Sequence, residues 1–142
     1  MQRSAYPVTL AADEVDGGFV VTCRDLPEAI TQGNTLEGAL QAAEGALAAA
    51  IEMRIEDGLD IPPPRKAKKG EHLPSLPVGS AMKAAVYLAM KEQGISKFDL
   101  ARRMDLDEKE ARRILDPKHS TKVLTLERAL HALGKRVEVV VV

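Results

Sequence analysis

The chain has 142 residues, of which 45% are hydrophobic and 29% charged, and this is typical of a folded protein of one domain or two small ones. No apolar run reaches the roughly 18 residues of a membrane span, and the first residues lack the apolar stretch of a signal peptide, so we expect a soluble, cytoplasmic protein. The single cysteine, Cys23, excludes an internal disulfide, and three scattered histidines predict no metal site and no cofactor.

The net charge of −1 conceals a strong asymmetry along the chain. Residues 1–60 carry 3 basic and 11 acidic side chains (net −8), residues 61–79 carry 4 and 1 (net +3), and residues 80–142 carry 13 and 9 (net +4). An acidic half followed by a basic half predicts two partners of opposite charge. Two solvated surfaces that differ by chance are the alternative.

Residues 1–60 predict a small α+β layer. Alternating apolar residues over 5–12 predict a strand, the Asp16-Gly17-Gly18 turn precedes a returning strand over 19–24, and a short third strand is plausible at 29–32. A helix that covers one face of this sheet is expected over 36–57.

The predicted helix has clear signals at both ends. Thr35 suits its N-cap and Gly58 its left-handed C-terminal position. Apolar residues recur between them at spacings of three and four, as on one face of a helix. This stripe comprises Leu36, Leu40, Ala43, Leu47, Ala50, Ile51 and Ile55.

Residues 61–79 hold five of the eight prolines and a basic cluster, Arg65-Lys66-Ala67-Lys68-Lys69. Consecutive prolines favour extended geometry and the like charges repel one another, which favours a linker. The alternative is a loop followed by an edge strand near 71–76, which would extend the first domain to about residue 77.

The remainder, residues 80–142, predicts an all-α domain that ends in a strand. Gly94 and Gly134 end two of the helices, and Thr125 is the expected N-cap of the last one. We expect helices over 80–93, 97–104, 108–115 and 125–133, and a valine-rich strand over 137–142.

Residues 96–115 fit the spacing of a helix-turn-helix. Small and apolar residues fall on the faces where the two helices would cross, and Leu106 plugs the turn between them. The residues on the crossing faces are Leu100, Ala101, Met104, Ala111, Ile114 and Leu115. Asp105 stands where glycine is common, and Asp tolerates the left-handed conformation better than most residues. A plain helical bundle with a solvated basic face is the alternative reading.

The outer face of the second helix and the loop after it are rich in cations and hydroxyl groups, which suit bases and phosphates in a major groove. The residues expected to bind DNA are Lys97, Lys109, Arg112, Arg113, Lys118, Ser120, Thr121 and Lys122. The valine-rich end would be an aggregation hazard if unpaired. Pairing with the same strand of a second copy, or insertion into its own domain, would remove the hazard. Pairing with a second copy would make a two-fold dimer and imply an inverted-repeat operator.

The segments Asp25-Leu26-Pro27-Glu28 and Thr31-Gln32-Gly33-Asn34-Thr35 strongly resemble the HicB antitoxins of bacterial toxin–antitoxin systems. So do Leu100-Ala101-Arg102-Arg103, His119-Ser120-Thr121-Lys122 and Ala132-Leu133-Gly134-Lys135, and the resemblance extends over nearly the whole chain. It implies an N-terminal domain like a truncated RNase H fold that masks HicA, a small basic mRNA-cleaving toxin. It also implies a C-terminal domain that represses the operon, in a dimer or tetramer.

Acidic groups on loops and at the end of the long helix are the expected contacts with a basic toxin, because opposite charges speed encounter. They are Asp13, Glu14, Asp16, Asp25, Glu28, Glu56 and Asp57.

Two other functions are alternatives. A nuclease would need converging carboxylates, and Asp13, Asp25 and Glu44 are a candidate set. Asp13 falls at a strand end and not inside the strand, so we expect no enzyme and no catalytic residues. A stand-alone transcription regulator whose N-terminal domain senses a small molecule is the other alternative.

Overall fold

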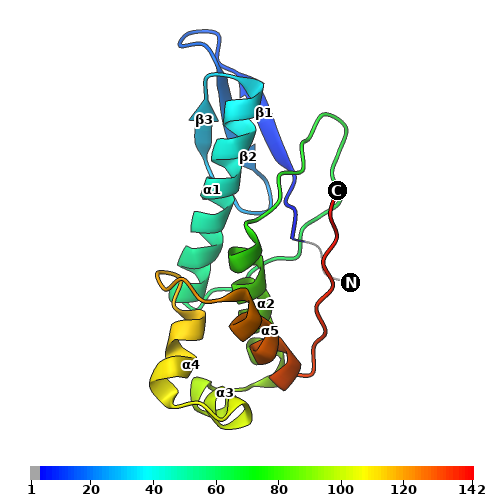
Figure 1. Cartoon of the computed structure of the whole chain (residues 1–142). Coiled ribbons are helices and arrows are strands. Elements are labelled where there is room, and N and C mark those ends of the chain that lie inside the picture. The colour runs from blue at the N-terminus through cyan, green and yellow to red at the C-terminus, as the bar shows by residue number, and fades with distance from the viewer. Residues whose placement is uncertain (1–3) are drawn as a thin grey trace. The chain divides into compact units, whose positions relative to one another are not determined.

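The computed structural model describes residues 4–142 (Figure 1). The chain forms two compact units, the first ending at Pro77 and the second beginning at Val78. The predicted α+β class is confirmed, since an antiparallel sheet with one long helix precedes four further helices.

The sheet of the first unit is an antiparallel meander in the order β1-β2-β3. Strand β1 (Val8–Ala12) pairs with β2 (Phe19–Cys23), and β2 pairs with β3 (Thr31–Gly33). The predicted hairpin is confirmed. The third strand begins two residues later than expected, because Ala29 and Ile30 still donate turn hydrogen bonds to the carbonyls of the preceding loop.

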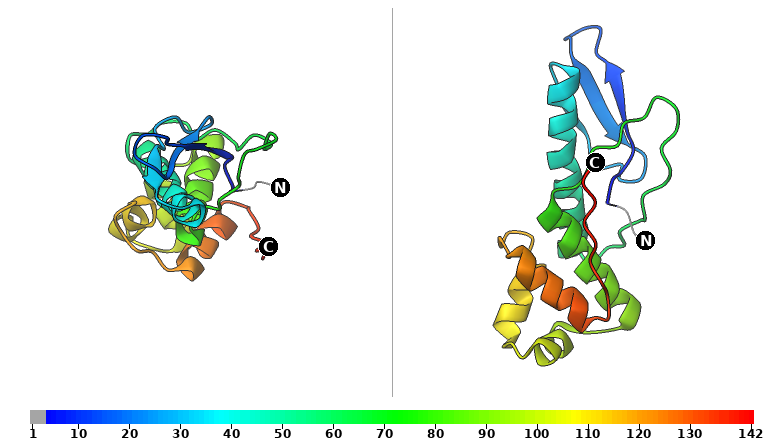
Figure 2. Two further views of the ribbon diagram at one scale, coloured as in Figure 1. Left: turned by 90° about the horizontal axis from the view of Figure 1, so that it is seen from above. Right: turned by 45° about the vertical axis from the view of Figure 1, so that its right-hand side comes forward.

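Helix α1 (Leu36–Glu56) lies along one face of this sheet, as Figure 2 shows. The Thr35 hydroxyl accepts a hydrogen bond from the Gly38 amide at 3.0 Å, so the predicted N-cap is confirmed. The buried face consists of Ala39, Ala43, Leu47, Ala50 and Ile51. The predicted stripe is wrong at its start: Leu36 is 46% exposed and Leu40 is half-buried, whereas Ala39, which lies between them, is buried.

Strand β3 and helix α1 approach each other with almost no space between their backbones. A Cβ atom at Gly33 would stand 2.4 Å from the Ala39 amide nitrogen and 2.5 Å from its Cα. Real Cβ atoms do not come this close to backbone atoms, so the close contact requires glycine at position 33.

The proline- and lysine-rich segment lies within the first unit, where it contacts the strand side of that unit. The buried Tyr6 hydroxyl donates to the Pro62 carbonyl at 2.7 Å. Farther along, Val8 and His72 exchange two backbone hydrogen bonds of 2.8 and 2.9 Å, and Ala5 forms a bridge with Ser75. The segment therefore pairs through two isolated bridges and not as a continuous edge strand.

The second unit contains the four predicted helices. They are α2 (Val78–Gln93), α3 (Lys97–Met104), α4 (Glu108–Leu115) and α5 (Val123–Ala132). The bounds predicted for α3 and α4 are confirmed. Helix α5 begins earlier than expected: Lys122, not Thr125, is its N-cap, and no side chain caps it.

The core of the second unit is aliphatic. Helix α2 packs against α4 and α5, and α3 packs against both α4 and α5. The largest fully buried side chains here are Val86, Leu100, Ile114 and Leu126, one from each helix. Tyr87 is also buried, as is Tyr6 in the first unit.

The predicted C-terminal strand is not observed. Residues 135–142 have no regular secondary structure, and the segment appears as an extended coil in Figure 1. Val139 to Val142 are between 71% and 111% exposed. A strand needs a neighbouring backbone to accept its hydrogen bonds, and within residues 4–142 no segment pairs with this one.

Among the described helices, none combines the length and the apolar character that crossing a membrane requires.

Candidate nucleic-acid interface and acidic surface

Both helices of the predicted helix-turn-helix begin with reciprocal side-chain caps. Ser96 accepts a hydrogen bond from the Asp99 amide, and the Asp99 carboxylate accepts one from the Ser96 amide. Asp107 and Glu110 form the same arrangement at the start of α4. Such capping boxes satisfy amides at each helix start, so the sequence fixes where α3 and α4 begin.

The turn between the two helices depends on Asp105, which adopts the left-handed conformation at φ 55° and ψ 45°. It is the one described residue other than glycine with a positive φ. The amide of Leu106, next along the chain, donates to the Ala101 carbonyl at 2.9 Å and closes the end of α3. The conformation predicted for Asp105 is thereby confirmed.

The inward faces predicted for α3 and α4 are largely confirmed. Leu100 and Ala101 are buried on α3, and Ala111, Ile114 and Leu115 are buried on α4. The predicted turn plug Leu106 and the α3 residue Met104 are only half-buried.

The predicted DNA-contacting residues lie at the surface of this unit. Lys97, Lys109, Arg112, Arg113, Lys118, Ser120 and Lys122 are exposed, and Thr121 is half-buried. Arg112 forms an ion pair with Glu108 one turn earlier at 2.7 Å, and its side chain remains 64% exposed. All three cations on the outer face of α4 are therefore accessible to solvent.

The start of α4 carries the opposite charge. Asp107, Glu108 and Glu110 are exposed in the first turn, where they complement the positive end of the helix dipole. These carboxylates repel phosphates, so anion attraction concentrates on the last turn of α4 and on the loop that follows it.

That loop, residues 116–122, is held by hydrogen bonds. The Lys118 amide donates to the Asp116 carboxylate at 2.9 Å, and the Thr121 hydroxyl donates to the Arg113 carbonyl at 3.3 Å. The His119 ring lies 3.1 Å from the same Thr121 hydroxyl. The loop thus presents Lys118, Ser120 and Lys122 from a fixed backbone.

Sequence reasoning missed Lys83, whose side chain also holds this loop. Lys83 lies on α2, is only 7% exposed, and donates from Nζ to the carbonyls of Asp116, at 2.5 Å, and His119. A lysine among apolar residues of an amphipathic helix gives no signal that its ammonium is buried. Only the position of Lys83 next to Met82, in the apolar stripe of α2, could have indicated that the ammonium is buried.

In the first unit, several predicted acidic residues are exposed. Glu14 and Asp16 lie at the β1–β2 hairpin tip beside Val15, which is 91% exposed. The Asp13 carboxylate accepts hydrogen bonds from the amides of Val15 and Asp16 at 3.0 and 3.1 Å, and this shapes the tip. Glu56 and Asp57 are exposed at the end of α1.

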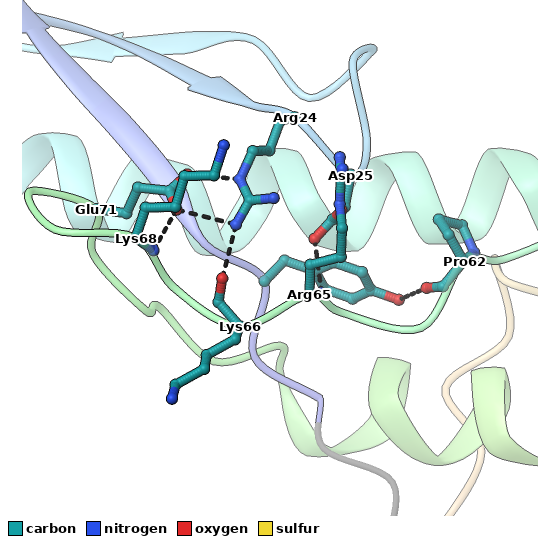
Figure 3. Close-up of polar contacts among 8 residues, drawn as sticks. Arg24, Asp25, Pro62, Arg65, Lys66, Lys68 and Glu71 are labelled. Carbon is teal, nitrogen blue, oxygen red and sulfur yellow. Dashed lines mark hydrogen bonds and ion pairs between the residues drawn. The ribbon is translucent and has the colours of Figure 1, made fainter.

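Two other predicted acidic residues are held by arginines. Glu28 pairs with Arg54 at 2.5 Å, and hydrogen bonding to that guanidinium lowers the pKa of Glu28. The Asp25 side chain is only 2% exposed and accepts hydrogen bonds from the Arg65 amide at 3.0 Å and the Arg65 Nε at 2.5 Å (Figure 3). Burial alone would raise the pKa of Asp25, but the bonds from Arg65 outweigh it and lower the pKa.

Arg24 also binds the proline- and lysine-rich segment, through Glu71 and Lys66. Arg24 donates to both Glu71 carboxylate oxygens, at 2.9 and 3.1 Å, and to the Lys66 carbonyl at 2.7 Å (Figure 3). Sequence reasoning assigned Arg24 and Glu71 no role, because partners 47 positions apart leave no local pattern.

Asp13, Asp25 and Glu44, the carboxylates that a nuclease would need, do not form a shared metal site. Within the described chain, no three His, Cys, Asp or Glu side chains are placed to share a metal ion. Burial raises the pKa of the Cys23 thiol, which opposes the reactive thiolate form.

Residues 5–85 match the sequence model of the HicB-like antitoxin of bacterial toxin–antitoxin systems. The chain belongs to this HicB-like antitoxin family. It is 36% identical to Antitoxin HicB of Escherichia coli over 137 residues, which cover 96% of this chain and 99% of the relative.

Two further relatives are also similar over nearly the whole chain. Antitoxin HicB 2 of Photorhabdus laumondii is 39% identical, with 96% of each chain covered. Antitoxin HicB of Pseudomonas fluorescens is 31% identical, with 93% of this chain and 91% of the relative covered. The resemblance found in the sequence is therefore confirmed. The HicB-like family is one of antitoxins and not of enzymes, as expected for this chain.

Proposed function

We propose that this HicB-like chain neutralises a HicA-type toxin through its first unit and represses its own operon through its second. The observation that supports the division most directly is the charge asymmetry between the units, net −5 in residues 1–77 against +4 in residues 78–142. A basic RNA-cleaving protein and a DNA duplex carry opposite charges, so each is attracted to a different unit.

The toxin-binding residues that we propose are exposed acidic side chains at both ends of the first unit. The hairpin tip offers Glu14 and Asp16 beside the exposed Val15, and the opposite end, where α1 ends (Figure 1), offers Glu56 and Asp57. Glu28 and Asp13 contribute negative potential while they hold their local partners. Asp25 has a buried side chain, so we assign it to structural support and not to direct contact.

The DNA-binding surface that we propose is the outer face of α4 with the loop after it. Lys109, Arg112 and Arg113 would face the major groove, and the loop residues Lys118, Ser120, Thr121 and Lys122 would contact phosphates. Lys97, at the start of α3, would reach the adjacent backbone. This proposal rests on the exposed side chains, the helix-turn-helix geometry and the net positive charge of the second unit.

We further propose that the second unit acts as a dimer. The tail 137–142 exposes a row of β-branched side chains on an unpaired backbone, which favours pairing with the same segment of another copy. Two copies related by a two-fold axis would read an inverted repeat.

The division of labour is tested by replacing Arg112 and Arg113 together with alanine. The double variant should lose binding to a duplex from the region upstream of its gene, measured by fluorescence anisotropy, because the contacts on α4 are removed. It should still rescue growth when co-expressed with the toxin encoded beside it. Rescue that fails while DNA binding persists would contradict the assignment of the two units.

A further inference from the structure

Lys83 makes the least expected polar contact of the second unit. It is one of two buried charged or polar residues identified in the described chain, and it lies at 7% exposure among the apolar residues of α2. Removing an ammonium from water is unfavourable unless its protons are accepted by good hydrogen-bond partners.

The partners of Lys83 define what the ammonium does. Its Nζ atom donates to the carbonyls of Asp116 and His119, which lie 33 and 36 positions away. Asp116 ends α4, so one bond satisfies the negative end of that helix. The other bond reaches into the following loop, and the two together tie the loop to α2.

The tied loop is the one that carries the proposed phosphate contacts. Lys118 is adjacent to His119 in the chain, and Ser120, Thr121 and Lys122 follow directly. A loop with a fixed backbone loses less entropy when its side chains bind an anion than a mobile one does. A buried cation beneath the loop also adds to its attraction for phosphate.

We propose that Lys83 is a positioning residue for DNA binding: through the carbonyls of Asp116 and His119 it fixes the loop 116–122 in the conformation that contacts phosphate. This inference rests on the proposed DNA-binding function. It assigns to a buried residue on α2 an effect that the exposed cations alone would not produce.

The test compares Lys83→Met with Lys91→Met and Lys83→Arg. Methionine keeps the aliphatic volume of Lys83 and removes its donors. Lys91→Met removes the same charge from the same helix at an exposed position, where the ammonium lies 5.3 Å from the Tyr87 ring centroid. The probe is the duplex from upstream of the gene, and its affinity is measured by anisotropy at several salt concentrations.

We expect Lys83→Met to weaken binding at least about tenfold and to reduce the salt dependence, because contacts between the loop and phosphates are lost. Lys91→Met should stay within about threefold of the wild type, and Lys83→Arg should recover part of the affinity. A wild-type chain that fails to bind the duplex contradicts the proposed function itself. A wild type that binds while Lys83→Met binds equally well overturns only the role of Lys83.

A double-mutant cycle separates positioning from general destabilisation. In the Lys83→Met background, Lys122→Ala should have almost no further effect on affinity, because the loop is already displaced. Arg112→Ala should cost the same factor in both backgrounds, since it lies on α4. Independent effects of Lys83→Met and Lys122→Ala would overturn the proposal.

Folding of each variant is checked by circular dichroism and thermal unfolding. Should Lys83→Met be unfolded at the assay temperature, Lys83→Gln, which removes the charge and shortens the side chain, takes its place in the cycle, and the same pattern is expected in weaker form. A folded Lys83→Gln that binds like the wild type and shows no coupling to Lys122→Ala counts against the proposal in the same way.

Discussion

The carboxylate of Asp25 is enclosed by Arg65, which donates to it from both its backbone amide and its guanidinium, although the two residues are 40 positions apart. Asp25→Ala leaves the Arg65 amide without its acceptor, and we expect a loss of about 2 kcal/mol in the free energy of unfolding of the first unit. Arg65→Ala should cost less, because the Arg65 side chain is 61% exposed and its backbone amide persists. Urea titrations of the two variants compare their free energies of unfolding. A larger loss in Arg65→Ala than in Asp25→Ala would show that the guanidinium contributes more to stability than the backbone amide does.

The hydrogen bond from Tyr6 to Pro62 predicts an alkaline transition. Burial raises the pKa of Tyr6 from 10.0 to about 12. A raised pKa in the folded state contributes stability that is complete below pH 10 and is lost as the pH rises toward 12. Tyr6→Phe should cost about 1 kcal/mol at neutral pH, and its deficit relative to the wild type should shrink above pH 10. Urea unfolding at increasing pH measures both, and a constant deficit would be inconsistent with the shifted pKa.

The contact between β3 and α1 predicts opposite effects for two glycine substitutions. Gly33→Ala forces a Cβ against the backbone of Ala39 and should destabilise the first unit by at least about 2 kcal/mol. Gly45→Ala, on α1 with open space around it, should stabilise the unit by roughly 0.5–1 kcal/mol through helix propensity. Thermal unfolding of the pair compares them directly, and a neutral Gly33→Ala would mean that β3 can move away from α1.

The ion pair between Glu108 and Arg112 predicts a gain-of-binding variant. Glu108→Gln frees the guanidinium and removes one negative charge from the first turn of α4, so DNA affinity should rise roughly fivefold at low salt. Glu92→Gln is the matched control, since it removes the same charge from an exposed site on α2. Equal effects of the two variants would attribute the gain to net charge alone.

The valine-rich tail predicts a change in assembly. Deletion of residues 137–142 should shift the chain toward a monomer in analytical ultracentrifugation and should lower affinity for a two-site duplex more than for a single half-site. Thermal unfolding of the second unit should change little, because Val139 to Val142 make no buried contacts within it. An unchanged sedimentation profile would place the dimer contact elsewhere.

Local signals predicted the starts of α3 and α4 well and failed where partners are distant. Ser96 with Asp99, and Asp107 with Glu110, fix the starts of α3 and α4 within four residues, so the sequence alone locates them. Thr125 had the right chemistry for a cap, yet α5 extends back to Lys122 without a side-chain cap.

The site residues show the same contrast between local signals and distant partners. The exposed cations of α4 follow from helical periodicity, whereas the burial of Asp25 and of Lys83 depends on partners 33 to 40 positions away. The tail 137–142 has strong strand propensity, but propensity supplies no neighbouring strand, and the predicted strand is not observed.

The chain has no tryptophan and only two tyrosines, Tyr6 in the first unit and Tyr87 in the second, both buried. Each unit therefore carries a single tyrosine fluorophore. A Tyr87→Phe chain would show tyrosine emission only from the first unit and a Tyr6→Phe chain only from the second. The melting of either half can thus be followed optically in the intact polypeptide without any attached label.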